Sequence, residues 1–564
     1  MLYLKLRQDY LLKGVVLGAV LLFCGLPVFR LAVEISTDIS LGMQSSFIDT
    51  LSRNATWTAA IHSLITASCS TLLAIILGGA WSYAIALTDI RGKSLLVFCL
   101  MLPMMIPPQV TALSWVQLFG PSSVLLNTFN LAPPLGSPQP LYSESGIILL
   151  LGIQQAPLVF LSLRAYLRNL PREIVEAARC SGANPGHVWR HHILPLSTPG
   201  LIAGGGIAFV SSLGNFGIPA ILGIPFSYYS LPTLIYQRLT DFGSNVLGSV
   251  ATLAFLIGCI AAMAVTTQHL LLKNRDFRLN GISGQPLSFQ LGCWRLPVEI
   301  LLWTILVLIL VLPLTALLAS SLVPAFGVQL SPATISFSAY REVLFHQDAT
   351  ARAFTNSLSL ATSCALLLLL ITVPLAYFSQ HRKQLWCKKL LVLVDLPFAL
   401  PGVVLSIACI LLFARPIPIL QLSLYGTLGI ILFAYLARFM AVSLKPVSAS
   451  FAQLDPAMEE AAASCGASFS RRMREILLPM VSPAAGASVI LVFLHACNEL
   501  TVSALLWSAK HETLGILIFN LDDGGESVLA AAVSVLIICL IMLLMFLLDR
   551  KASDLPKGVI PWRD

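Results

Sequence analysis

Two stretches of this sequence repeat one pattern of residues. Residues 176–195 read EAARCSGANPGHVWRHHILP, and residues 460–479 read EAAASCGASFSRRMREILLP. Each begins with Glu-Ala-Ala, continues after three residues with Gly, and ends with Pro 19 positions after its Glu. Glu460 follows Glu176 by 284 residues in a chain of 564, and both stretches are polar and flanked by long apolar segments. We expect this repeated helical elbow to hold a partner outside the membrane, once in each half.

The composition is that of an integral membrane protein. The chain is 57% hydrophobic and 11% charged, whereas an ordinary soluble domain is about 25% charged. Its apolar runs far exceed the roughly 10-residue alternating strands of an outer-membrane barrel, which predicts an all-α membrane protein. We interpret residues 14–33 as an uncleaved first span rather than a signal peptide. Twelve spans are expected, near 12–34, 58–87, 94–119, 145–164, 197–222, 245–272, 297–323, 355–379, 388–414, 424–443, 481–507 and 528–549.

The distribution of Lys and Arg predicts the orientation. With the N-terminus inside, 27 of the 34 Lys and Arg residues, Arg438 among them, fall on the inner side. This asymmetry follows the positive-inside rule and accounts for the net charge of +8 without nucleic acid. Both termini and both elbows are therefore expected in the cytoplasm. Most of the twelve cysteines lie in apolar runs without a CxxC pair, so we interpret them as small buried side chains rather than disulfides or metal ligands.

The two halves also match outside the elbows. Residues 62–64 align with 356–358, and 102–107 with 396–401, at an offset of 294. The offset is 284 at the elbows, so the first half has about ten extra residues, which we assign to an external loop at 121–140. An even number of spans in each half makes the repeat parallel. The expected organisation is a first half at 1–272, a cytoplasmic linker at 273–296 and a second half at 297–564.

The elbow is predicted to be two short helices joined at a glycine. In the second copy, Asp455 is the expected N-cap and Pro456 the first helical residue, and Gly466 suits a left-handed helix end. Leu478-Pro479 is expected to end the second helix before the next span. The first copy follows the same plan, from Pro171 and Glu173 through Gly182 to Leu194-Pro195.

The elbow surface is suited to a partner. Its alanines leave a smooth face, and Glu176 and Glu460 each offer an acceptor. The alternative is an amphipathic helix whose arginines touch lipid phosphates, which equal spacing in two matching loops disfavours. The residues assigned to docking are Glu176, Ala177, Ala178, Gly182, Pro195, Glu460, Ala461, Ala462, Gly466 and Pro479.

These residues resemble a known family. Glu-Ala-Ala, three residues, Gly, nine residues, Ile, one residue and Leu-Pro is similar to the signature loop of ABC importer permeases of type I that work with a periplasmic binding protein. The second copy fits throughout, and the first has His192 in place of the Ile. The resemblance covers both halves and implies two permease subunits fused head to tail. It further implies that each loop forms a coupling helix that docks on a cytoplasmic ATPase, so that two ATPase subunits and a periplasmic substrate-binding protein are expected partners, together with membrane lipid and no nucleic acid. The implied location is the bacterial inner membrane.

The chain itself is not expected to be an enzyme. It contains no G-x-x-x-x-G-K-[ST] motif, and Gly92-Lys93-Ser94 is interpreted as a basic turn between spans. We therefore expect no cofactor in this chain, with ATP and Mg bound by the partner ATPase. A secondary transporter of the major facilitator type is the competing class, since it also has six plus six spans. Its loop signature matches residues 88–93 only in part, and it lacks a repeated Glu-Ala-Ala elbow.

Polar residues inside spans are candidates for the translocation pathway because a charge there is costly, about 2.5–3.5 kcal/mol on insertion scales. The alternative role is hydrogen bonding between helices. Prolines at 103, 107, 108, 397 and 401 are expected to kink paired spans, and Gly204-Gly205-Gly206 to allow close packing or a hinge. The candidate pathway residues are Asn215, His495, Asn498, Glu499 and Asp395, with Asn215 aligned to Glu499.

The substrate is inferred from resemblance and from donor chemistry. The stretches 498–500 and 512–514 resemble ferric-iron permeases, and oxygen donors such as Glu499 suit a hard cation. Fe(III) import is the expected function, with thiamine, phosphonate or polyamine import as alternatives. The nine histidines give no predicted stable metal site.

Overall fold

The architecture is helical in both repeats of the sequence. The computed structural model describes residues 12–40, 42, 45–134, 136–168, 170, 172–240, 246–273, 287–414 and 423–550. Within these ranges the regular elements are helices, and the β-pairing is one isolated bridge between Thr88 and Phe289. The predicted all-α class is confirmed. The predicted linker at 273–296 falls largely on residues 274–286, which lie outside the described ranges.

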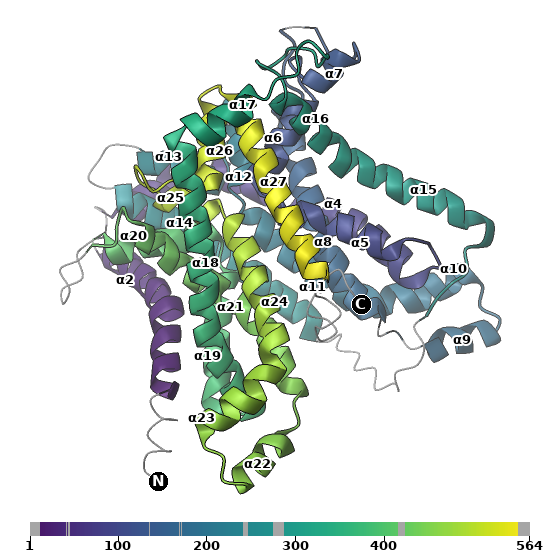
Figure 1. Cartoon of the computed structure of the whole chain (residues 1–564), viewed down its shortest axis with the longest axis vertical. Helices are drawn as coiled ribbons and strands as arrows, with labels where there is room; N and C mark the ends of the chain where they lie inside the picture. The colour runs from purple at the N-terminus through teal and green to yellow at the C-terminus, as the bar shows by residue number, and fades with distance from the viewer. Residues whose placement is uncertain are drawn as a thin grey trace. The chain divides into compact units, whose positions relative to one another are not determined.

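The elements follow one another in two corresponding series (Figure 1). The first helix of the described residues, Leu12–Ser40, contains η1 (Leu21–Gly25) and α2 (Leu26–Ser40), and α3 (Ser46–Ser52) follows it. The first series is α4 (Asn54–Leu87), α5 (Lys93–Met105), α6 (Pro108–Leu118), α7 (Val124–Thr128), α8 (Glu144–Arg168), α9 (Arg172–Cys180), α10 (Pro185–Val188), η3 (Trp189–Ile193), α11 (Leu194–Leu213), α12 (Gly217–Gly223), η4 (Ile224–Phe226), α13 (Leu231–Thr240) and α14 (Val246–Lys273).

The second series is introduced by η5 (Gly292–Trp294), α15 (Arg295–Leu306), η6 (Val307–Val311) and α16 (Leu312–Ser321). It continues with α17 (Ser338–Arg341), η7 (Glu342–His346), α18 (Asp348–Ala376), η8 (Tyr377–His381), α19 (Leu385–Ala399), α20 (Gly402–Phe413), α21 (Leu428–Gln453), α22 (Pro456–Ser464), α23 (Phe469–Arg472), η9 (Met473–Leu477), α24 (Leu478–Cys497), α25 (Thr501–Leu506), α26 (Leu514–Asp523) and α27 (Ser527–Arg550).

Ten helices in the described residues are long and apolar enough to cross a membrane. Three further pairs of shorter helices would raise this number to thirteen if each bent pair is one span. The predicted twelve lies within this range. The spans expected at 197–222 and 481–507 end earlier than predicted, with α11 at Leu213 and α24 at Cys497. In the first case a separate bent pair, Gly217–Phe226 and Leu231–Thr240, follows.

The chain packs as two compact units that cut across the halves of the sequence. Unit 1 holds Met1–Arg53, Ile235–Phe255 and Tyr340–Asp564, and unit 2 holds Asn54–Leu234 and Leu256–Ala339. In unit 1, α2 packs on α20 of the second repeat, and the sulfur of Cys24 lies 3.7 Å from that of Met440. In unit 2, α16 packs on α6 of the first repeat. Each repeat therefore covers its core with the first helix of the other.

Prolines break one pair of helices in each unit. The angle between α5 and α6 is 101°, and the angle between α19 and α20 is 105°. Ile106 and Leu400 are extended, as the steric clash with a following proline requires. Pro107 and Pro401 then cap the next helix, with ψ angles of 139° and 140°. The predicted kinks are thus near-right-angle turns.

The run of three glycines in α11 serves close packing, as predicted. A Cβ at Gly204 would lie 2.9 Å from Cα of Val159, so a larger residue there requires α8 to move. A Cβ at Gly206 would overlap the side-chain amide of Gln268, which would have to turn away.

Candidate coupling elbows and intramembrane helix breaks

The two elbows have the same backbone. The first helices, α9 and α22, begin and end at positions exactly related by the 284-residue offset, as do α10 and α23. Gly182 and Gly466 each have φ of +84°, which confirms the predicted left-handed residue after the first helix. Asn184 and Ser468 then cap the second helix through their side chains. Asp455 caps α22 as predicted and accepts from the amide of Ala457, whereas Pro171 lies outside the described residues.

The expectation that Leu-Pro ends the elbow is wrong. Residues 185–213 form one long helix, and so do residues 469–497. The reason is a π-turn before each proline, at Trp189–Ile193 and at Met473–Leu477. The wider turn accommodates Pro195 and Pro479 at the start of the next α-helical segment, where an amide donor is not needed. The second arm of each elbow therefore continues into the following span without interruption.

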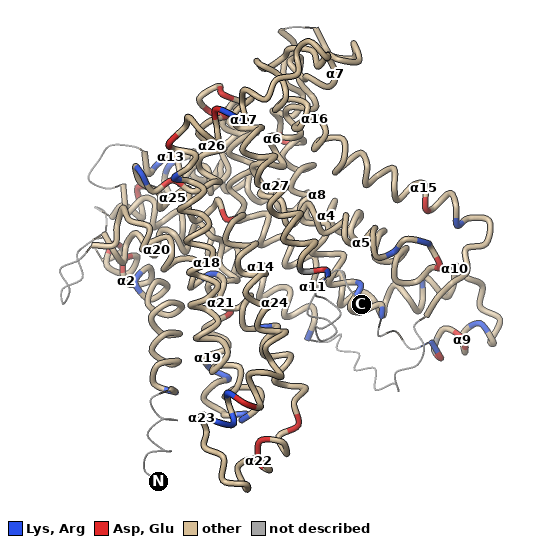
Figure 2. The backbone as a smooth tube through the Cα atoms, viewed as in Figure 1, with Lys and Arg blue, Asp and Glu red and all other residues tan. Residues whose placement is uncertain are grey.

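Most of the predicted docking residues are exposed, and Ala178 also contacts the apolar side of its elbow. Glu176, Ala177, Glu460 and Ala461 are exposed, as are Pro195 and Pro479, while Ala178 and Ala462 are partly buried. Glu176 forms an ion pair with Arg172 one turn earlier. The small residues thus leave an accessible surface with a carboxylate on it. Figure 2 shows charged residues gathered at α22 and α23, in contrast to the mostly uncharged helices of the spans.

The inner sides of the elbows differ in chemistry. In the first elbow, Val175 is 3% exposed and packs in an apolar cluster. The other buried members of this cluster are Leu87, Leu163, Leu167, Leu170, Val188, Ile193 and Leu287. In the second elbow, the residue at the position of Val175 is Glu459, whose side chain is 7% exposed.

Glu459 is surrounded by polar side chains from two segments, residues 377–382 and α23. Its Oε2 lies 3.1 Å from Nε2 of His381, and its Oε1 accepts a 3.0 Å hydrogen bond from the hydroxyl of Tyr377. Arg382 donates to Oε1 at 3.1 Å, and Arg472 lies 3.4 Å from the same oxygen. A carboxylate with these partners is compensated in its buried position, as a buried charge must be.

The span after each elbow stops at a polar break. In unit 2, Asn215 lies between α11 and α12 and accepts from the amide of Ile218 at 3.2 Å. In unit 1, Glu499 lies between α24 and α25 and accepts from the amide of Val502 at 3.1 Å. Each side chain thereby satisfies a free amide at the start of a short helix, which is the usual task of an N-terminal cap.

Arg438 is the partner of Glu499. Its Nε donates to Oε2 of Glu499 at 3.0 Å, and its Nη1 donates to the carbonyl of Leu400 at 3.4 Å. Arg438 therefore joins the α24–α25 break to the α19–α20 break. The side chains of Arg438 and Glu499 are 22% and 11% exposed, in the interior of α21 and at the end of α24. The positive-inside rule concerns loop residues, so Arg438, which lies inside α21, carries no weight in that count.

The first repeat has a neutral pair at the same place. Gln154 corresponds to Arg438 at the 284-residue offset, and its Oε1 accepts from Nδ2 of Asn215 at 3.4 Å. Sequence reasoning missed Gln154 and Arg438. The alignment of Asn215 with Glu499 could have indicated them, because Gln154 and Arg438 are related by the same offset of 284 residues.

The remaining pathway candidates divide into two places. His495 and Asn498 lie at the end of α24 near Glu499, and the His495 ring packs edge-on to Phe439. Asp395 is exposed on α19 and does not share their position. Among the described residues there is no group of three His, Cys, Asp or Glu side chains that could hold a metal ion.

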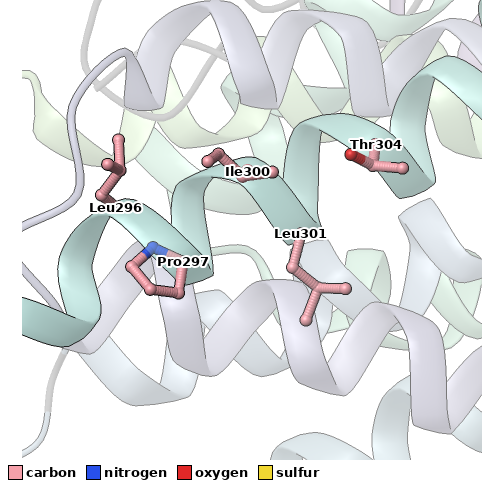
Figure 3. Close-up of a pocket in the computed structure, with 5 residues that line it drawn as sticks. All are labelled: Leu296, Pro297, Ile300, Leu301 and Thr304. Carbon is pink, nitrogen blue, oxygen red and sulfur yellow. The ribbon is translucent and has the colours of Figure 1, made fainter.

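An apolar pocket lies along one helix of unit 2. Its lining residues are Leu296, Pro297, Ile300, Leu301 and Thr304, all on α15 (Figure 3). One hydroxyl is the sole side-chain polar group among these five. The pocket therefore lacks the groups that would bind an ion or a nucleotide.

The loop after α4 is tied to the start of α15. Asp89 accepts from the amide of Leu291 at 3.0 Å and lies 3.6 Å from Arg295. The hydrogen bond from Leu291, together with the nearby Arg295, holds the pKa of Asp89 below its ordinary value. Glu299 accepts from the amide of Arg91 at 2.7 Å. This loop, which partly matched the major facilitator signature, thus connects the end of α4 to the start of α15 within unit 2.

Two regions of the chain, residues 70–270 and 370–553, match the family model for the binding-protein-dependent transport system inner membrane component. The chain belongs to this family. The permease carries the family domain twice, which makes it a fused two-half ABC importer permease. The major facilitator alternative is therefore wrong. Proteins of this family work as permease subunits with an ATPase and a substrate-binding protein.

Three relatives illustrate the range of the family. The permease is 25% identical to a probable ABC transporter permease protein of Sinorhizobium fredii, over 97% of this chain and 96% of the relative. It is 26% identical to a ferric transport system permease protein of Actinobacillus pleuropneumoniae, over 81% of this chain and 66% of the relative. A relative from Salmonella typhimurium named for 2-aminoethylphosphonate transport is 29% identical over 28% of this chain and 59% of the relative.

Proposed function

We propose that this permease imports Fe(III) delivered by a periplasmic binding protein, driven by two ATPase subunits that dock on its two elbows in the cytoplasm. The observation that carries the docking is the identical backbone of the elbows, each with an exposed Glu-Ala-Ala surface. In this proposal the permease lies in the inner membrane, with both termini and both elbows on the cytoplasmic side. ATP and Mg bind to the ATPase subunits, and this chain contributes no catalytic group.

The pathway is proposed to pass the polar breaks. Asn215 and Glu499 lie at corresponding ends of the spans that continue from the elbows. A span that moves with its elbow would therefore shift the side chain at its far end, which links the cytoplasmic motor to the substrate route. Residues His495 and Asn498 belong to the same proposed region, and Asp395 is a more distant candidate.

Fe(III) is supported by the relatives named for ferric transport and by the carboxylate of Glu499. In the structure this carboxylate is paired with Arg438, so binding of a hard cation requires Arg438 to move away. The same guanidinium favours a second candidate, a small oxyanion such as a phosphonate, since Arg pairs well with such groups.

Uptake measurements separate these substrates. Cells that depend on this permease are grown with little iron, and accumulation of radiolabelled Fe(III) is compared with that of a labelled phosphonate, thiamine and a polyamine. We expect deletion of the gene to abolish Fe(III) uptake alone. Unchanged Fe(III) uptake in the deletion strain would remove the assignment, and loss of phosphonate uptake instead would establish the second candidate.

Docking is tested at the partly buried alanines. Ala178→Asp and Ala462→Asp place a charge on the docking surface, and each should abolish uptake while the permease still inserts in the membrane. The ATPase should no longer copurify with the double variant. Lys510→Asp, an exposed change on another loop, serves as the control. Normal uptake in both alanine variants would contradict docking at the elbows.

A further inference from the structure

The second elbow is held to its span by polar and charged side chains at positions where the first elbow has apolar side chains. His381, Glu459 and Arg472 correspond to Leu87, Val175 and Val188, the first at an offset of 294 and the others at 284. At three positions in separate parts of the chain, the first repeat has an apolar side chain and the second has a polar or charged one. Tyr377, which also contacts Glu459, keeps its identity as Tyr83 in the first repeat.

We propose that Glu459 is a positioning residue that locks the second elbow to the cytoplasmic end of α18 through an ionic joint, and that the two elbows are mechanically inequivalent. Any effect of this inequivalence on transport rests on the proposed docking of an ATPase at both elbows. The joint itself rests on contacts within unit 1 alone.

The contacts of Glu459 join the first arm of the elbow to the end of α18 and to the second arm. Tyr377 and His381 lie on η8, at the end of α18, and Arg472 lies on α23, the second arm of the elbow. The His381 side chain is 1% exposed and that of Arg472 is 14% exposed, so these partners are held away from solvent. Arg382 is 44% exposed and adds a weaker, screened contact.

An ionic joint and an apolar joint respond differently to loss of one member. Apolar contacts are additive and non-directional, so the cluster around Val175 keeps most of its packing when one side chain is trimmed. Removal of one charge from a buried set leaves the others uncompensated, whereas removal of the whole set in favour of apolar residues is often harmless. The ionic joint is therefore the one that a single substitution opens.

The geometry of the first elbow shows that an apolar joint supports the same backbone. Its Tyr83 hydroxyl, lacking a carboxylate partner, lies 2.7 Å from the hydroxyl of Ser197 instead. The charges of the second elbow are thus not needed for its shape. They determine how strongly the elbow is held to α18.

Two native cysteines give a direct test. Cys180 and Cys465 are exposed at the ends of α9 and α22. In purified permease without ATPase, we would measure the mobility of a spin label in variants that retain one of these cysteines alone. Glu459→Gln should raise the ratio of mobile to immobile label at Cys465 by about tenfold, because Arg472 loses its buried partner, and should leave the ratio at Cys180 unchanged.

Two further variants make the result specific. The triple variant His381→Leu, Glu459→Val, Arg472→Val copies the first elbow and should restore the immobile label at Cys465. Glu475→Gln removes an exposed carboxylate that pairs with Arg471 on the same elbow, and should leave the mobility unchanged. Wild-type mobility in Glu459→Gln, or a triple variant as mobile as the single one, would overturn the proposal.

The same variants separate the joint from the docking of the ATPase. In the assembled transporter, Glu459→Gln should raise the ATP hydrolysed per substrate imported, and the triple variant should return this ratio to the wild-type value. Loss of ATPase binding at Ala178→Asp and Ala462→Asp with unchanged spin-label mobility at Cys465 tests docking alone. If docking failed there while Glu459→Gln still freed Cys465, the ionic joint would stand and the proposed partner would not.

Discussion

The two repeats of the permease have the same backbone and different polar interiors. At the elbow, the first repeat buries Val175 among apolar side chains, and the second buries Glu459 among His381, Arg472 and Tyr377. At the helix break, the first repeat pairs Asn215 with Gln154, and the second pairs Glu499 with Arg438. Both differences run in the same direction, from neutral to ionic. The fold therefore depends on shape and caps at these positions, while the charges are free to specialise one repeat.

The largest effect is expected at the helix break of the second repeat. Arg438→Gln leaves the carboxylate of Glu499 without its partner and should lower the free energy of unfolding by about 3 kcal/mol, the scale for breaking a buried pair. The double variant Arg438→Gln, Glu499→Asn copies the neutral pair of the first repeat and should come within about 1 kcal/mol of wild type. Thermal unfolding in detergent measures both. A double variant no better than the single one would show that the pair is not the reason for the loss.

A smaller effect is expected in the apolar joint of the first repeat. Val175→Ala removes two methyl groups from a side chain that is 3% exposed, which should lower the free energy of unfolding by about 2 kcal/mol. The loss should be spread over the cluster, so the mobility of a spin label at Cys180 should rise less than that at Cys465 does in Glu459→Gln. Equal increases would remove the mechanical distinction between the elbows.

The elbow glycines should respond equally, since their backbones are the same. Gly182 and Gly466 have φ of +84°, and a Cβ at either would meet no atom within 4 Å. Ala at each position should therefore cost about 1 kcal/mol from backbone strain alone. Thermal unfolding of Gly182→Ala and Gly466→Ala should agree within error. A clear difference would mean that the surroundings, and not only the backbone, distinguish these turns.

The smallest effect is local and depends on pH. The pKa of Asp89 is lowered in the folded protein from 3.8 by the hydrogen bond from the Leu291 amide and by Arg295. A carboxyl with a depressed pKa stabilises the folded state above its unfolded pKa and loses this contribution as the pH falls through its folded pKa. Protection of the Leu291 amide from hydrogen exchange should therefore decrease below about pH 3.8, after correction for intrinsic exchange. Asp89→Asn should remove the pH dependence, and the second repeat, with Lys383 at this position, should show none.

Much of this architecture follows from local sequence signals. The elbow helices, their caps and the left-handed glycines depend on neighbouring residues, so Asp455, Gly182 and Gly466 were predictable. The family followed from the spacing of the repeated Glu-Ala-Ala pattern. The prolines indicated bends, although the nearly perpendicular turn depends on Ile106 and Leu400 becoming extended before them.

Other features depend on contacts between distant segments. The partners of Glu459 come from residues 377–382 and from 472, and the partner of Glu499 lies 61 positions before it. No pattern within one segment indicates such pairs, and a charge count by segment gave no sign that Arg438 pairs with Glu499. The exchange of first helices between the units was equally hidden, because apolar periodicity says which face is buried but not what covers it. The π-turn before Pro195 was missed because Leu-Pro usually marks a helix end.

The unbroken helix through each Leu-Pro has a consequence for timing. A helix of 29 residues is a stiff rod of about 43 Å, with one end in the elbow and the other at Asn215 or Glu499. A tilt of about 5° at one end displaces the other by about 4 Å, more than the length of the hydrogen bonds made there. Disturbance of the elbow and rearrangement of the polar break would then be one event, with no intermediate in which the first has occurred and the second has yet to follow.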